Sequence, residues 1–196
     1  MKKGETYISG KCVQHYIMPS NEIDDLNHKY ENIKDNLNSY GALLAGRLDS
    51  ELSFTHVLTK TEIYKTITKC IDNYIDTLID YHLLEEGKKH LEIISCWIND
   101  MVQGEYNPPH THHNGTGFSS VLFLKVPEFI HDEKDPHKFK DGKLCFIMNQ
   151  DQTSWMTPKV GDFYLFQANH QHCVMPFKTK LPNDMRRSMS FNFIIK

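Results

Sequence analysis

The sequence lacks the features that mark a membrane-spanning or exported protein. None of its apolar runs approaches the roughly 18 residues of a membrane span, and the opening segment MKKGETYISG has no apolar stretch like that of a secretory signal. The sequence also has no internal repeat and no low-complexity segment. Its 196 residues can bury a substantial core. We therefore expect one cytoplasmic domain with no membrane partner.

A strong excess of charge of one sign is also missing. The chain has 22 Lys and Arg against 25 Asp and Glu, with a formal net charge of -3. No block of consecutive basic residues is longer than two. Because a nucleic-acid surface needs clustered basic side chains, the composition argues against a nucleic-acid partner and favours a small or local substrate.

Paired cysteines are absent as well. The five cysteines, at positions 12, 70, 96, 145 and 173, are odd in number and show no CxxC spacing. Disulfide frameworks and zinc fingers require paired or closely spaced cysteines. We interpret these residues as reduced, buried thiols.

The pattern of apolar residues changes along the chain. Apolar residues recur at intervals of three and four over residues 23–40 and again over about 61–86, and Gly87 then supplies a stop, which predicts two amphipathic helices. Later segments such as LEIISCWI, FSSVLFLKV and RSMSFNFII are short apolar runs separated by turn residues. We therefore expect a mainly β protein, with residues 1–90 as a helical cover of the same domain and residues 91–196 as a sandwich or jelly-roll core.

Histidines gather just before one of the expected strands, in the segment YNPPHTHHNGTGFSS. His110 and His112 are two residues apart, so on a strand their side chains lie on one face and can bind the same metal ion. A third candidate, His172, lies far downstream, and His170 competes with it because both have the same strand parity. Neutral imidazole binds iron, copper, zinc and nickel, so these residues alone leave the metal open.

The last expected strand has one polar face. Arg186 and Ser188 alternate on that face, followed by Ser190 and Asn192, while Arg187 and apolar residues fall on the other. A guanidinium group forks onto a carboxylate through two charge-assisted hydrogen bonds, and a hydroxyl can add a third. A β-bulge would shift the register by one residue and place Arg187 on the polar face instead.

Three segments in this order, NPPHTHHN, PKVGDFYLFQANHQHCVMPF and MRRSMSFN, resemble the Fe(II)- and 2-oxoglutarate-dependent oxygenases with a double-stranded β-helix core. The pattern WxNxxxxGEYNPPHTHH followed by FSSVLFLKVP is similar to the short oxygenases of the phage and prolyl hydroxylase type found in marine cyanophages. The resemblance covers roughly residues 91–196, and it implies a cupin-like jelly-roll enzyme. If the protein is phage-encoded, it would act in the host cytoplasm.

The resemblance implies roles for individual residues. His110 would be the proximal ligand of Fe(II), His112 would occupy the position of the family's usual carboxylate, and His172 would be the distal ligand. Replacing the carboxylate with neutral imidazole removes one negative charge from the metal site. Arg186 and Ser188 would hold the distal carboxylate of the cosubstrate 2-oxoglutarate. Tyr164, on the strand after Gly161, is a further candidate for the pocket.

The resemblance also implies the reaction. The enzyme would use O2 and 2-oxoglutarate to hydroxylate its substrate, and it would release succinate and CO2. Peptidyl-prolyl groups, other peptides and small metabolites are all compatible substrates. We expect substrate contacts in exposed loops such as residues 127–142.

Two other functions fit the histidines. A cupin-type three-His dioxygenase would work without a keto acid, although the glutamate expected after its HxH motif is missing from HNGTGFSS. A non-enzymatic β-barrel module would hold a metal ion for structural or partner-binding reasons, with a closed coordination sphere.

Overall fold

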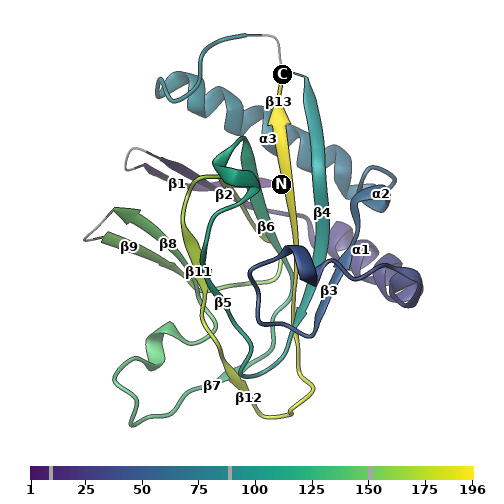
Figure 1. Ribbon diagram of the computed structural model, residues 1–196, viewed down its shortest axis with the longest axis vertical. Helices are drawn as coiled ribbons and strands as arrows, with labels where there is room; N and C mark the ends of the chain where they lie inside the picture. The colour runs from purple at the N-terminus through teal and green to yellow at the C-terminus, as the bar shows by residue number, and fades with distance from the viewer. Residues whose placement is uncertain (9–10, 88–89, 150–151) are drawn as a thin grey trace.

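Two antiparallel β-sheets form the centre of the computed structural model, which describes residues 1–8, 11–87, 90–149 and 152–196 (Figure 1). The larger sheet has the strand order β1-β2-β10-β6-β13-β4-β3, and the smaller has the order β5-β11-β8-β9. The strands of the larger sheet are β1 (Lys2–Ile8), β2 (Cys12–Ile17), β10 (Asp162–Gln167), β6 (Phe118–Lys125), β13 (Arg186–Ile195), β4 (Leu91–Met101) and β3 (Ser50–Ser53). Those of the smaller sheet are β5 (Asn107–His110), β11 (His172–Val174), β8 (Leu144–Asn149) and β9 (Gln152–Met156).

Short elements complete the fold. The strands β7 (Phe129–Ile130) and β12 (Lys178–Thr179) pair with each other as a separate two-stranded ribbon. The helices are α1 (Ser20–Ile33), α2 (Thr55–Leu58) and α3 (Ile63–Asp80), and the 3-10 turns are η1 (Lys34–Asn36), η2 (Gly41–Leu43), η3 (His113–Gly115) and η4 (Lys138–Lys140). None of the described helices is long and apolar enough to cross a membrane.

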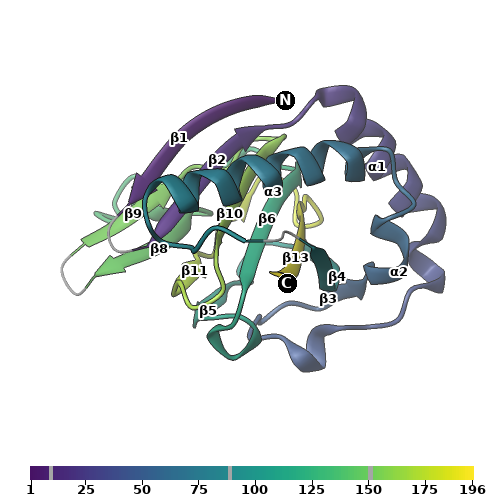
Figure 2. The same cartoon turned by 90° about the horizontal axis from the view of Figure 1, so that it is seen from above.

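The helix α3 runs along the outer face of the larger sheet (Figure 2). One hydrophobic cluster includes buried residues of the helices and of this sheet. The helix α3 contributes Ile67, Ile71 and Leu78, whose side chains are fully buried. Each such side chain contributes about 1.5–3 kcal/mol by leaving water. They pack in the same cluster as Phe163 and Phe191 of the sheet. This packing attaches the N-terminal helices to the β core.

A second cluster lies between the two sheets. Alternation along β10 separates the two clusters, because Phe163 belongs to the helix-side cluster whereas Tyr164 and Phe166 belong to the inter-sheet cluster. Phe146 of the smaller sheet packs at 5.1 Å from Phe166, measured between ring centroids. The structure thus confirms the predicted mainly β fold with a jelly-roll core and N-terminal helices.

The N-terminal segment departs from the expected pattern in two ways. Its first residues form β1 and β2, which extend the larger sheet next to β10. The strand β2 is buried on both faces, so its sequence CVQHYI shows no alternation that would have indicated a strand. The helices are also shorter than predicted: α1 ends at Ile33 rather than near residue 40, and α3 ends at Asp80, before His82 with φ of +56° and well before Gly87.

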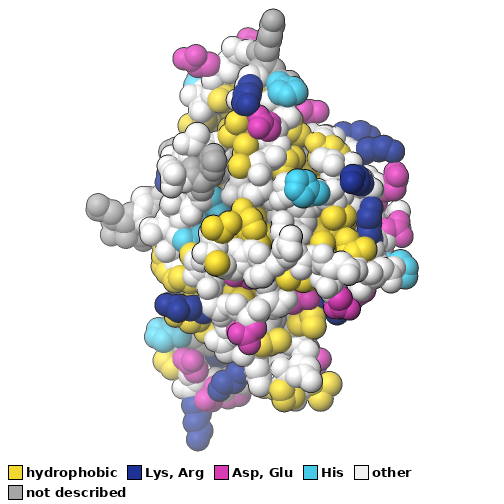
Figure 3. All heavy atoms as spheres, turned by 45° about the vertical axis from the view of Figure 1, so that its right-hand side comes forward, with side chains coloured by type: hydrophobic (Ala, Val, Ile, Leu, Met, Phe, Trp, Pro, Cys, Tyr) yellow, Lys and Arg dark blue, Asp and Glu magenta, His cyan; other side chains and the backbone are white. Residues whose placement is uncertain are grey.

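Charges are mixed over the surface. On the face shown in Figure 3, acidic and basic side chains of the described residues are interspersed with hydrophobic ones. Several of the exposed charges form ion pairs, including Lys65 with Glu62 and Lys180 with Glu128. Such exposed pairs contribute little to stability, so the interior of the fold carries most of it.

Candidate metal centre

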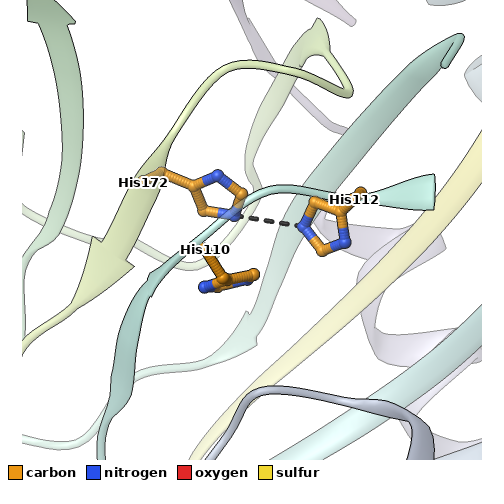
Figure 4. Close-up of side chains that lie close together, drawn as sticks. All are labelled: His110, His112 and His172. Carbon is orange, nitrogen blue, oxygen red and sulfur yellow. Dashed lines mark hydrogen bonds between the residues drawn. The ribbon is translucent and has the colours of Figure 1, made fainter. Parts of the chain in front are cut away.

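Three histidines meet at the edge of the smaller sheet. His110 ends β5 and His172 begins β11, and these two residues are directly paired in the antiparallel register. His112 lies just beyond the end of β5, where its backbone N–H donates to the carbonyl of Ala168 over 2.9 Å. One candidate ligand atom from each of the three residues lies within 4.8 Å of the others. Figure 4 shows the three rings converging from the two chain segments.

The expected arrangement on one strand face is wrong in detail. The strand ends at His110, so His112 does not reach the cluster through strand alternation. It reaches the cluster because the chain bends beside Ala168, and the ring centroids of His110 and His112 then lie 5.0 Å apart.

Backbone carbonyl groups orient two of the rings. His110 Nδ1 lies 2.7 Å from the carbonyl oxygen of Pro108, and His172 Nδ1 lies 2.9 Å from that of His170. A carbonyl oxygen accepts only, so each Nδ1 carries the proton and each Nε2 keeps its lone pair. In metal sites this second hydrogen bond fixes the tautomer and the orientation of a histidine ligand. Both rings are therefore prepared to bind a metal ion through Nε2.

The electrostatic environment keeps the three rings neutral. Burial lowers the pKa of His110, and burial together with His110 lowers the pKa of His112 to about 3. Burial, reinforced by the other two rings, holds the pKa of His172 well below its usual range. Neutral imidazole is the form that binds a metal ion. The donor set therefore fits a transition metal, and among the described residues it includes no carboxylate.

His170 lies outside the cluster. Its side chain is fully buried, packs 5.2 Å from Phe146 and has no hydrogen-bond partner for either ring nitrogen. Its backbone carbonyl, by contrast, orients His172. The structure therefore brings His172 to the cluster and places His170 behind it, although both residues have the same strand parity.

A cavity of about 500 Å³ opens beside the histidines, between the two sheets. Its walls come from the inner faces of β4, β6 and β13, from β5 and β11, and from the segment between α1 and β3. The described residues that line it include Tyr40, Gly46, Glu51, Trp97, Asn99, Asn107, His110, His112, His172, Arg186 and Ser188.

Arg186 lies in this cavity with an incomplete set of partners. Its guanidinium group is fully buried, with Nη1 donating to the Gly142 carbonyl over 2.9 Å and Nη2 lying 2.8 Å from Met101 Sδ. Nε has no partner, and no described carboxylate pairs with this guanidinium. Burial lowers the pKa of Arg186 to about 9, so it remains charged at neutral pH. A buried, unpaired cation fits an anionic ligand.

Arg187 points to the opposite face of β13. Its guanidinium group donates to Asp100 over 2.5 and 2.7 Å and to Glu31 over 2.8 Å, and it lies 4.3 Å from the centroid of the Tyr30 ring. All of its anionic contacts are within the protein. The register irregularity between β13 and β6 lies between Arg187 and Ser188 and leaves Arg186 and Ser188 both lining the cavity.

The sequence of the β core decides the family. Residues 95–192 match the model of the family described as "Putative 2OG-Fe(II) oxygenase". The chain belongs to this 2OG-Fe(II) oxygenase family. The protein is therefore an enzyme of the class that uses Fe(II) and takes 2-oxoglutarate and O2 as cosubstrates. Comparison with curated proteins found no match.

Solved structures with the same fold include prolyl hydroxylases. A prolyl-4-hydroxylase from Pseudomonas putida matches with a TM-score of 0.64 and 15% identity, over 96% of this chain and 94% of that one. The viral collagen prolyl hydroxylase of Paramecium bursaria Chlorella virus-1, solved with 2OG, matches with a TM-score of 0.63 and 13% identity, over 92% and 94%. A prolyl hydroxylase from Trichoplax adhaerens, solved with a peptide fragment, matches with a TM-score of 0.63 and 14% identity, over 95% and 84%. At these identities the likeness shows the oxygenase fold.

Tyr164 has a different position from the one expected. Its ring stacks on His15 with the centroids 4.7 Å apart, and it lies outside the set of described residues that line the cavity. Burial raises the pKa of Tyr164 above its usual range, and the charge of Asp162 raises it further. Its side chain belongs to the inter-sheet cluster, where its ring centroid lies 6.2 Å from that of Phe146 and 6.5 Å from that of Phe123.

Sequence reasoning missed part of the oxygenase cavity. Among the described residues, none between 127 and 142 lines it, whereas Tyr40, Gly46 and Glu51 from the N-terminal part do. The sequence pattern that could have indicated this wall lies on β4, where Trp97 and Asn99 are two residues apart and therefore share the inner face of the strand. The segment before β3 carries no comparable pattern. Its position beside the cavity depends on the pairing of β3 with β4, which the local sequence does not show.

Proposed function

We propose that this oxygenase hydroxylates a C–H bond of its substrate, with His110, His112 and His172 as the ligands of Fe(II) and with Arg186 and Ser188 binding the distal carboxylate of 2-oxoglutarate. The observation that carries the proposal is the buried Arg186, which has an unpaired Nε and lines the same cavity as the three histidines. Bound Fe(II) would supply the redox chemistry that couples 2-oxoglutarate decarboxylation to oxidation of the substrate by O2.

The overall reaction balances without another cosubstrate. One oxygen atom of O2 enters the substrate as a hydroxyl group, the other enters succinate, and the keto acid loses CO2. The protein supplies position and charge. Arg186 provides a fixed cation in a buried site, where an interaction with a carboxylate is stronger than it is in water. Ser188, at 4% exposure, stands two residues further on the same face of β13 and would donate its hydroxyl proton to the same carboxylate.

Anaerobic binding tests this proposal. Addition of Fe(II) and 2-oxoglutarate is expected to give the weak visible charge-transfer band of the chelate. The variant Arg186→Gln keeps a polar side chain and removes the charge. In this variant, the 2-oxoglutarate concentration at which the band reaches half of its maximal intensity should rise by roughly 30-fold or more, because a buried charge pair is lost. Arg47→Gln, at an exposed arginine, is the control and should bind like wild type.

Two results would contradict the proposal. If Arg186→Gln gives the band at the wild-type concentration of 2-oxoglutarate, the assignment of Arg186 fails. If wild type binds metal without forming the band, the cupin-type dioxygenase or the metal-binding module replaces the oxygenase reaction. Turnover of a substrate thiol without keto acid would favour the former, and a fully coordinated zinc ion would favour the latter.

Two classes of substrate fit the proposed reaction. The prolyl hydroxylase relatives, one of them bound to a peptide, support a peptide substrate, and the cavity also accommodates a small metabolite. All five cysteines are free, which supports action in the reducing cytoplasm. A phage origin, and the assignment of residues 1–90 and 91–196 to one folding unit, stay predictions.

A further inference from the structure

Glu51 places an unpaired carboxyl group in the cavity. Its side chain comes from the edge strand β3, it is only 4% exposed, and no described Lys, Arg or His side chain forms an ion pair with it. The acidic residue whose charge acts on it, Glu105, already accepts hydrogen bonds from the backbone N–H groups of Asp49 and Val102, each over 2.7 Å. Burial, with the charge of Glu105, raises the pKa of Glu51 to about 7. A bound cation would relieve both effects.

Asn99 adds a second polar group beside Glu51. The two residues are directly paired between β3 and β4, so their side chains project from the same face of the sheet. Asn99 is 6% exposed, and its Oδ1 atom is buried without a hydrogen-bond partner. Its partner on the other side is Ser188 of β13. Glu51, Asn99 and Ser188 therefore form a polar row that leads from the edge of the sheet to the proposed 2-oxoglutarate site.

Aromatic rings connect this row to the metal centre. Trp97 lies two residues before Asn99 on β4, and its ring centroid is 5.7 Å from that of His112. Tyr40 stacks on Trp97, with centroids 5.6 Å apart and planes inclined by 25°. Both aromatic residues line the cavity. Their faces carry partial negative charge, which favours a neighbouring cation.

The backbone closes tightly over the same corner. A Cβ atom on Gly46 would lie 2.4 Å from Asn107 Oδ1 and 2.7 Å from Glu51 Oε1. Asn107 Oδ1 is a further buried acceptor without a partner. Three oxygen-bearing side chains, those of Glu51, Asn99 and Asn107, thus line the cavity, and the two amide oxygens have no hydrogen-bond partner among the described residues.

We propose that this corner, formed by Glu51, Asn99, Asn107, Trp97 and Tyr40, binds a protonated amine or guanidinium group of the substrate, so that the enzyme oxidises a basic amino acid or a basic side chain of a peptide. The inference rests on the proposed function, in which the anionic cosubstrate occupies the Arg186 end of the cavity. A cation has donors for the carboxylate and the amide oxygens and can stack on the aromatic faces. A prolyl residue within a peptide has neither a charge nor an N–H group to offer these acceptors.

The test compares matched ligands on the Fe(II) and 2-oxoglutarate complex under anaerobic conditions. Arginine against citrulline, and lysine against norleucine, differ mainly in the presence of the cation. Each is used as the free amino acid and as its N-acetyl amide, so that a free amino acid is distinguished from a peptide side chain. Calorimetry measures the dissociation constants, and the charge-transfer band reports separately on metal and 2-oxoglutarate binding.

For at least one pair, we expect the dissociation constant of the cationic ligand to be lower than that of its neutral counterpart by about 10-fold or more, as is typical of a hydrogen bond to a charged group. Glu51→Gln, which has nearly the same shape without the charge, should lose this preference. Asn99→Asp adds a carboxylate in the same row and should increase it. Glu128→Gln, at an exposed glutamate, is the matched control and should keep the wild-type preference.

Equal binding of cationic and neutral ligands to wild type would overturn the inference, as would a preference that persists in Glu51→Gln. Thermal melting shows whether each variant is folded, and the Asn99→Asp variant tests the same idea if Glu51→Gln does not fold. If the band is absent but the cation preference is present, the proposed function fails and the inference about this corner stands. If the band is present and the cation preference is absent, the inference about this corner fails and the proposed function stands.

Discussion

The Nε2 atoms of His112 and His172 lie only 3.1 Å apart in the interior of the protein. His172 already donates its Nδ1 proton to the carbonyl of His170, so its Nε2 presents a lone pair toward His112. Two lone pairs at this distance repel each other unless a proton or a metal ion lies between them. The contact therefore links the metal centre to the stability of the fold.

Metal binding is expected to stabilise the protein. Removal of metal with a chelator should lower the melting temperature, and addition of Fe(II) under anaerobic conditions should restore it, because a ligand that binds only the folded state stabilises that state. In His172→Ala the metal-dependent shift should disappear. His131→Ala, at an exposed histidine paired with Asp141, is the control. A metal-dependent shift of wild-type size in His172→Ala would contradict the assignment of this ligand.

The stability of the metal-free protein should fall as the solution becomes acidic. Burial lowers the pKa values of His110 and His172 and brings that of His112 to about 3, below the value of 6.5 expected in the unfolded chain. As the pH falls below about 6.5, the unfolded chain takes up protons that the folded chain does not, so the free energy of unfolding decreases. Urea unfolding at a series of pH values measures this slope. His112→Asn should make it shallower, and an unchanged slope would show that His112 does not contribute.

Arg187 is expected to stabilise the fold rather than bind a cosubstrate. Its side chain is fully buried and paired with Asp100 and Glu31. Arg187→Ala should lower the free energy of unfolding by about 3–5 kcal/mol, because it leaves a largely buried carboxylate without its cation. Urea denaturation measures the change. Lys65→Ala, which removes one partner of an exposed ion pair, should have little effect, and a comparably small effect of Arg187→Ala would refute the prediction.

Gly117 is expected to tolerate no side chain. Its φ is +77°, and a Cβ atom would lie 2.6 Å from the carbonyl oxygen of Phe193. Gly117→Ala should therefore destabilise the protein by more than about 1 kcal/mol, through backbone strain and the close contact. Gly87→Ala is the matched control, because nothing lies within 4 Å of a Cβ at that position. Thermal denaturation of both variants compares them, and equal melting temperatures would refute the prediction.

Local sequence patterns predicted much of the β core. The alternation in segments such as DFYLF and RSMSFNFII places successive side chains on opposite sides of a strand, and the structure keeps this separation at Phe163 and Tyr164. The strand β2 was missed because both of its faces are buried and its sequence therefore does not alternate. The helix ends were missed because the apolar spacing continues beyond Ile33 and Asp80, where the backbone leaves the helical conformation.

The candidate site combines local and distant information. The histidine spacing and the family resemblance brought His110, His112 and His172 forward, with His170 as a competitor, and the tertiary structure brings His110, His112 and His172 together. Their grouping depends on the pairing of β5 with β11, which a sequence read one segment at a time does not contain. The walls of the cavity show the limit most clearly, since Glu51 and Asn99 become neighbours only through the pairing of β3 with β4.

The sequence by itself predicted that side chains alternate along each strand, with Arg186 and Ser188 on one face, and it left open a β-bulge that would place Arg187 on that face instead. Alternation is a property of the backbone and acts over two residues. Only the tertiary structure decided which of those faces lines the cavity, that His172 rather than His170 joins the cluster, and that the segment carrying Tyr40 and Glu51 borders the site. Those choices follow from strand register and core packing, in which each residue is placed by partners far away in the chain.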